Sequence, residues 1–170
     1  LIFLIGIFFL PSAPFFGSLL LIFPLTIGIK NNLQFILKDK LNYLLFVASL
    51  LMLFKCIVTS SFDLAVIENW DSSLNWIGLG NWIPLLIFYL GIQNYVRSSA
   101  RRKILAKVLI LGTVPVIFSC FSQYFLKWYG PYEFLNGFIV WFQRPRTEVY
   151  QPITGLFNNP NYAGAWLAMI

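Results

Sequence analysis

The sequence lacks histidine and has few charged residues. Of its 170 residues none is His, and only 11% are Asp, Glu, Lys or Arg. A soluble globular chain carries about 25% charged residues. Together with long apolar runs, this scarcity excludes an ordinary soluble domain. It predicts an all-α, polytopic bundle of about four to five transmembrane helices.

Cysteine is nearly absent as well, which leaves little for metal or disulfide chemistry. Cys56 and Cys120 are the only two cysteines, and both lie within or at the edge of apolar segments. They form no CxxC motif, and without histidine the usual zinc ligand sets cannot be assembled. We therefore expect neither a metal site nor a structural disulfide.

Acidic residues are outnumbered, six against twelve basic ones, which gives a formal net charge of +6. In a soluble protein this excess would suggest nucleic acid. Here the basic residues cluster beside apolar runs, as the signals that orient membrane helices do. We expect no nucleic-acid partner, and we interpret the charge as a record of topology.

The apolar runs predict where the spans lie. Residues 1–29 carry no charge, so they lack the basic start of a secretory signal peptide. Because Pro11 and Pro14 interrupt them, they form either one tilted, kinked span or two half-helices that meet at Ser12. The further spans are expected at 41–59, 81–96, 104–126 (bent at Pro115) and 161–170.

The last of these runs is cut at Ile170, and the chain begins with Leu1. We therefore expect a truncated, N-terminal piece of a larger polytopic protein. Chemistry that is missing from it is then not missing from the whole.

Lysine and arginine predict the orientation. They are enriched in the segments 30–40 and 97–107, whereas residues 60–81 contain only acidic charges. The positive-inside tendency places the first two segments in the cytoplasm and the third outside. By alternation residues 127–160 are external too, although they hold Lys127, Arg144 and Arg146. These external cations go against the tendency.

The external segment 127–160 begins with many aromatic residues. They form either an aromatic belt at the membrane surface or, over residues 133–142, a short interfacial helix. Arg144 and Arg146 follow, stiffened by Pro145 and Pro152. A guanidinium suits phosphate because its planar fork donates several hydrogen bonds. The pair could instead bind anionic membrane lipids or Glu148.

Three asparagines precede the final apolar run in "TGLFNNPNYAGAWL", residues 154–167. Asn159 suits the N-cap and Pro160 the first helical position, and Gly155 suits a tight turn before them. Asn161 and Gly164 would then share a face with Ala165 and Ala168, where small residues allow close helix packing. The same helix N-terminus favours anions.

The motifs "QRP" and "TGLFNNPNYAGAWLAM", together with the opening "FFLPSAPFFGSLLLI", resemble the O-antigen ligase and polymerase family, most closely its cyanobacterial members. The resemblance implies a GT-C-type glycosyltransferase of the bacterial inner membrane. Such a protein transfers a glycan from undecaprenyl pyrophosphate, a lipid-linked donor, to lipid A–core or another glycan, without a metal or nucleotide sugar. It makes Arg144 the first candidate for a pyrophosphate contact and Arg146 the second.

The sequence also departs from that family. The base implied by the resemblance is a histidine in a large periplasmic loop, and these residues contain neither. The piece alone would then be inactive and would hold no catalytic residue. Two alternatives stay open, a transporter or flippase subunit with proline-broken spans and a scaffold without chemistry.

Overall fold

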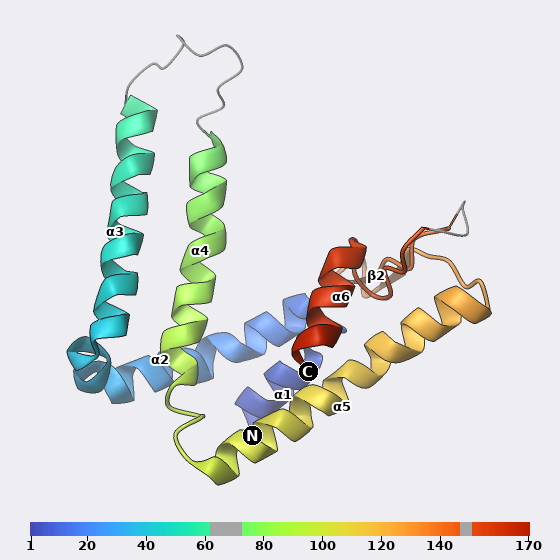
Figure 1. Cartoon of the computed structure of the whole chain (residues 1–170), viewed down its shortest axis with the longest axis horizontal. Helices are drawn as coiled ribbons and strands as arrows, with labels where there is room; N and C mark the ends of the chain where they lie inside the picture. The colour runs from blue at the N-terminus through green and yellow to red at the C-terminus, as the bar shows by residue number, and fades with distance from the viewer. Residues whose placement is uncertain (62–72, 147–150) are drawn as a thin grey trace. The chain divides into compact units, whose positions relative to one another are not determined.

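The computed structural model describes residues 1–61, 73–146 and 151–170 (Figure 1). Four of the helices in this part of the chain, α2 to α5, are long and apolar enough to cross a membrane. The prediction of a mostly helical membrane protein is therefore confirmed. The elements are α1 Ile2–Phe9, α2 Pro14–Lys38, α3 Lys40–Ser61, α4 Ser73–Ile92, α5 Ser99–Phe125, β1 Tyr132–Phe134, β2 Ile139–Trp141 and α6 Pro160–Met169.

The start of the chain forms two helices. α1 ends at Phe9, and α2 begins at Pro14, a residue that suits the first turn of a helix. The two helices fold back on each other where their glycines meet. A Cβ on Gly6 would lie 2.8 Å from the Leu21 side chain, and one on Gly17 would lie 3.0 Å from the Gly6 carbonyl oxygen. Residues 1–29 therefore break near Ser12 into two helices, as in the second alternative, but α2 has 25 residues and is long enough to cross a membrane, so it is not a half-helix.

Two helix boundaries differ from the hydropathy-based ones. The segment 30–40, expected to be a loop, is helical as far as Lys38, since it holds neither Gly nor Pro. The buried Asn32 amide donates to the Gly28 carbonyl at 2.9 Å and so supports the helix there. α4 covers Ser73–Ile92 instead of 81–96, because the chain turns at the polar pair after Ile92.

The described chain divides into two compact units, which we describe separately. Unit 1 comprises Leu1–Pro24 and Val96–Ile170, and unit 2 comprises Leu25–Tyr95. The division falls at Pro24 inside α2, where the helix loses a backbone hydrogen bond.

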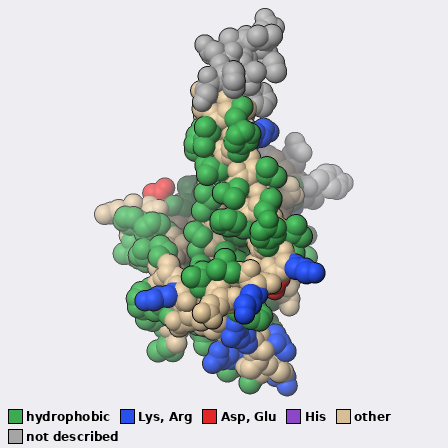
Figure 2. Space-filling view, turned by 90° about the vertical axis from the view of Figure 1, so that its left-hand side faces the viewer, with side chains coloured by type: hydrophobic (Ala, Val, Ile, Leu, Met, Phe, Trp, Pro, Cys, Tyr) green, Lys and Arg blue, Asp and Glu red, His purple; other side chains and the backbone are tan. Residues whose placement is uncertain are grey.

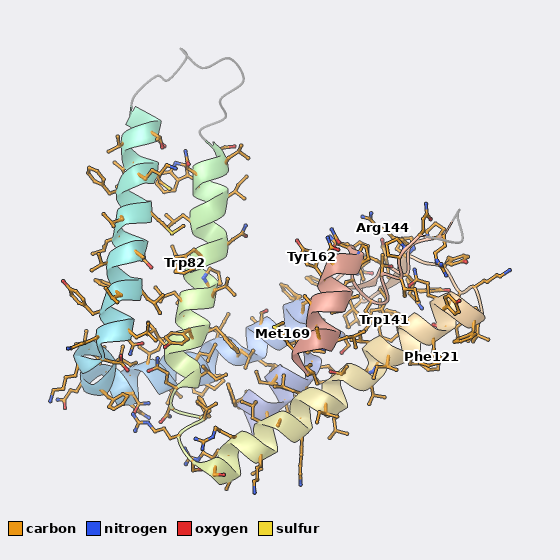
Figure 3. The ribbon with its side chains drawn as sticks, in the orientation of Figure 1. Trp82, Phe121, Trp141, Arg144, Tyr162 and Met169 are labelled. Atoms are coloured by element: carbon orange, nitrogen blue, oxygen red, sulfur yellow. The ribbon has the colours of Figure 1, made fainter. Side chains whose placement is uncertain are left out.

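Unit 2 contains an antiparallel pair of helices, α3 and α4, joined by side-chain hydrogen bonds. The Gln93 amide donates to the buried Asn42 at 2.9 Å, and the Trp82 indole, which lies between the helices in Figure 3, donates to the Ser49 hydroxyl at 2.8 Å. Apolar side chains cover the outer surface of the pair (Figure 2). If α3 slid along α4 by one turn, the Gln93–Asn42 and Trp82–Ser49 hydrogen bonds would both break, so these bonds fix the register of the two helices. At the other end Trp76 donates to Ser60 at 2.7 Å.

In unit 1 both α1 and α6 pack on α5 (Figure 1). The α1 backbone approaches so closely that a Cβ on Gly112 of α5 would lie 2.7 Å from the Phe8 carbonyl oxygen. α6 contacts α5 through Trp166, whose indole donates to the Thr113 hydroxyl at 3.0 Å. α5 has 27 residues and is therefore about 40 Å long, enough to span the bilayer.

The expected interfacial helix at 133–142 is wrong, because these residues form an antiparallel β-hairpin in which Glu133 pairs with Val140. The physical reason is local. Asn136 and Gly137 have positive φ values of 55° and 85°, which suits a hairpin loop, and β-branched and aromatic residues flank them. The aromatic composition that suggests a membrane belt also suits a strand.

The hairpin lies against the turn between α1 and α2. The Trp141 indole donates to the Ser12 carbonyl at 2.8 Å, and the Phe138 and Phe15 ring centroids are 5.1 Å apart. The α1–α2 turn therefore lies at the same end of unit 1 as the hairpin. The cationic residues at the start of α5 lie at the other end of that helix.

Candidate functional site

Two buried amides attach the segment 127–160 to α5, and the first of them belongs to Gln123. Gln123, in the last turn of α5, is 0% exposed and uses all of its hydrogen-bonding capacity. Its Nε2 donates to the Arg144 carbonyl at 2.8 Å and to the Thr154 hydroxyl at 3.1 Å. Its Oε1 accepts from the Thr154 and Gly155 backbone N–H groups at 3.1 and 2.9 Å. Gln123 thus joins residue 144 to residues 154–155, on either side of the segment 145–153.

A second buried amide holds the residue before Arg144. Gln143 donates through Nε2 to the Ser122 hydroxyl at 2.7 Å and to the Ser119 carbonyl at 3.0 Å. Its backbone N–H donates to the Gly155 carbonyl at 2.9 Å, and its carbonyl accepts from Gly130 at 2.9 Å. Its φ is +30°, a conformation that L-residues rarely adopt. The hydrogen bonds of its side chain, N–H and carbonyl hold Gln143 in this conformation.

Arg144 follows the buried Gln143 and is itself exposed. Its backbone N–H donates to the Thr154 hydroxyl at 3.1 Å, and its side chain is exposed. Within residues 1–61, 73–146 and 151–170 the guanidinium makes no hydrogen bond or ion pair. Figure 3 places Arg144 at the end of unit 1 that carries the hairpin and the start of α6. The Arg144 guanidinium is therefore exposed, while hydrogen bonds fix its backbone.

Arg146 is held by the protein itself. Its Nε donates to the Gln151 carbonyl at 2.8 Å across the loop, and its guanidinium lies 5.1 Å from the centre of the Tyr124 ring. A cation over an aromatic face is attracted to it. Arg146 therefore braces the loop, and the two arginines have different roles. Glu148, the carboxylate that was the expected alternative partner of the pair, lies outside the described residues.

The electrostatics at this end of unit 1 favour an anion. The part of unit 1 that the structure describes contains a single carboxylate there, Glu133, against the three cations Lys127, Arg144 and Arg146. Salt screens exposed charges over about 8 Å at physiological ionic strength, so a bound anion must come close to them. What the arrangement offers is a donor of several hydrogen bonds to a phosphate-like group.

Gly155 lies where the loop returns to α5. Its φ is +54°, and a Cβ built on it would lie 2.7 Å from the Cys120 sulfur and 3.1 Å from the Ser119 hydroxyl. Glycine is therefore required here for two reasons, its backbone conformation and the close approach.

Gly155→Ala should destabilise the full-length protein by about 2–4 kcal/mol, because left-handed strain adds to the steric clash. The double variant with Cys120→Ala should recover only the part due to the clash. Gly137→Ala, also at a positive φ (+85°) but with open space around it, isolates the strain. Unfolding of the detergent-solubilised protein measures all three. If Gly155→Ala and Gly137→Ala lower the free energy of unfolding equally, the proposed close approach at Gly155 is contradicted.

The asparagine cluster begins α6. The Asn159 side chain accepts from the Asn161 backbone N–H at 2.8 Å, and Pro160 is the first helical residue. The small-residue face does not pack as expected. Asn161 and Gly164 are exposed, with nothing within 4 Å of a Cβ built on Gly164, and Ala163 is the buried residue of α6. Against the described residues, α6 packs through Ala163 and Trp166 instead.

The sequence analysis missed Gln123 and the role of Gln143. A signal was present, since Ser122 and Gln123 follow Ser119 by three and four residues, which are helical spacings, within an apolar run. Polar side chains repeated on one face of a membrane helix indicate a buried partner. That partner lies 21 to 32 residues further along the chain, so the sequence does not identify it.

The chain was compared with models of protein families, with curated proteins and with solved structures. No protein-family model, curated protein or solved structure matches it.

Proposed function

We propose that this chain is part of an integral membrane glycosyltransferase of the O-antigen ligase and polymerase type. In this proposal the whole protein takes a glycan from undecaprenyl pyrophosphate on the outer side of the bacterial inner membrane. It transfers the glycan to lipid A–core or to another glycan. Arg144 binds the pyrophosphate.

One observation carries the proposal. Arg144 displays an exposed guanidinium, without a partner among the described residues, on a backbone fixed by a buried amide. A charge that served only to orient the helices would need no such fixation. It would also be expected on the cytoplasmic side rather than outside.

The chemistry fits the role. Glycan transfer leaves a diphosphate that gains negative charge as the glycosidic bond breaks. A guanidinium held at that position stabilises the developing charge without having to reorganise. Arginine keeps its charge at any physiological pH and can donate two parallel hydrogen bonds to a phosphate.

The transporter alternative has less support. A carrier of ions or charged solutes places ionisable side chains inside the membrane. The buried polar side chains among the described residues are Ser, Thr, Asn and Gln, none of them charged. They join helices and loops to one another, as the hydrogen bonds of Gln123 and Asn42 illustrate.

Photo-crosslinking tests the proposal. The full-length protein is incubated in nanodiscs with a polyprenyl diphosphate that carries a photoreactive group beside the diphosphate, and the crosslinked peptides are identified. We expect crosslinks to residues 143–146 and 151–155, and competition by unlabelled polyprenyl diphosphate. Crosslinks confined to other peptides would reject the assignment of this site.

A further inference from the structure

Gln123 fixes both ends of the segment 145–153 to α5, and the two ends also bond to each other, since the Arg144 N–H donates to the Thr154 hydroxyl at 3.1 Å and the Gln143 N–H to the Gly155 carbonyl at 2.9 Å. Gln123 bonds to residue 144 at one end and to residues 154 and 155 at the other, through four hydrogen bonds of 2.8–3.1 Å. Among the described side chains of α5, Gln123 alone bonds to both ends. The position of the Arg144 backbone relative to α5 thus depends in part on Gln123, 21 positions earlier in the chain.

We propose that Gln123 is a positioning residue, which holds Arg144 toward a phosphate-bearing ligand by fixing both ends of this loop to α5. The ligand in this statement rests on the proposed function. The anchoring does not, because it follows from the hydrogen bonds alone.

Only a glutamine satisfies this position. Two groups that face it are acceptors, the Arg144 carbonyl and the Thr154 hydroxyl, and two are backbone N–H donors, those of Thr154 and Gly155. The reverse orientation of the amide would place oxygen against a carbonyl and NH₂ against both donors, so the surroundings dictate the orientation. Glutamate would lose both donors, leucine would lose all four bonds, and asparagine is one methylene too short.

The conformation of Gln143 supports the same inference. Residues held at an unfavourable φ persist only where their surroundings over-determine them, and they concentrate at functional sites. Gln143, with φ +30°, is bonded through its side chain, its N–H and its carbonyl. This residue immediately precedes Arg144, so its unusual φ sets the course of the backbone into the site.

Positioning matters here because arginine is long and flexible. A side chain of this kind loses conformational entropy when it binds, and a mobile backbone would add to that loss. The hydrogen bonds of Gln123 and Gln143 fix the backbone before the ligand binds, so no backbone entropy is lost on binding. If the hydrogen bonds of Gln123 are lost, Arg144 keeps its charge but binds the ligand less tightly.

The test is a double-mutant cycle in the full-length protein. The variants are Gln123→Leu, Arg144→Ala and their combination, and the matched control is Gln34→Leu, the same change at an exposed position of α2. Two quantities are measured in nanodiscs. They are hydrogen exchange of the Thr154 and Gly155 amides, and the dissociation constant of a polyprenyl diphosphate.

Gln123→Leu should speed exchange at both amides and weaken diphosphate binding, each by about tenfold, without further weakening once Arg144 is alanine. Gln123→Glu, which keeps the acceptor oxygen, should protect the two amides better than leucine does. Gln34→Leu should change neither quantity.

The possible outcomes separate the two proposals. Unchanged exchange in Gln123→Leu would overturn the anchoring. An equal loss of affinity with and without Arg144 would show a general structural role and overturn the positioning. If Arg144→Ala alone leaves the affinity unchanged, the proposed function fails and the positioning of Arg144 toward a phosphate fails with it. The exchange data would still decide whether Gln123 anchors the loop.

Discussion

Replacing Arg144 with alanine should reduce glycan transfer by the full-length protein by about a hundredfold or more, the usual cost of removing a donor that stabilises transition-state charge. The side chain is exposed and bonds to none of the described residues, so little folding energy depends on it. The loss should therefore appear in transfer and not in the amount of protein in the membrane. Activity is measured in cells that lack the native copy, with membrane content quantified in parallel.

Two further substitutions sharpen this result. Arg144→Lys keeps the charge but loses the fork that grips phosphate with two bonds, so an intermediate loss is expected. Arg146→Ala removes a brace, the bond to Gln151 and the contact with Tyr124, and should cost less activity than Arg144→Ala. Wild-type transfer by Arg144→Ala would remove the site assignment.

Cysteines placed at Asn136 and Ser99 should react with a membrane-impermeant maleimide from opposite sides of the inner membrane. Asn136 lies in the hairpin loop after α5 and Ser99 is the first residue of α5, so the whole helix, about 40 Å long, separates the regions they mark. Both residues are exposed. Asn136→Cys should be labelled from the periplasm, whereas Ser99→Cys should be labelled only after the membrane is opened.

The background for this experiment is Cys56→Ser with Cys120→Ala. Serine retains a donor at position 56, where the thiol now lies 3.3 Å from the Asn75 carbonyl. The reverse labelling pattern would overturn the topology. It would place Arg144 in the cytoplasm, and an external diphosphate could then not reach it.

Hydropathy and charge predicted the membrane class because both depend on composition over a whole span. They are less informative about boundaries. The cytoplasmic end predicted at residue 30 lies inside α2, because a lysine beside an apolar run does not stop a helix. α4 likewise begins at Ser73, within a stretch that hydropathy alone assigned to a loop.

The candidate site was only partly predictable. Arg144 and Gly155 stand out in the sequence because a cation in a segment predicted to be external and a glycine before a helix cap are each locally unusual. Gln123 is neither, since one glutamine near the end of a span resembles an interfacial residue. Its importance comes from bonds to Arg144, Thr154 and Gly155, which the chain brings together only on folding.

The most direct test of the central claim is the affinity of the purified full-length protein for polyprenyl diphosphate and for polyprenyl monophosphate, each with arginine or alanine at position 144. We predict that the diphosphate binds more tightly to the wild type and that Arg144→Ala removes most of this preference. A preference that is unchanged in Arg144→Ala would contradict the claim that this guanidinium holds the diphosphate.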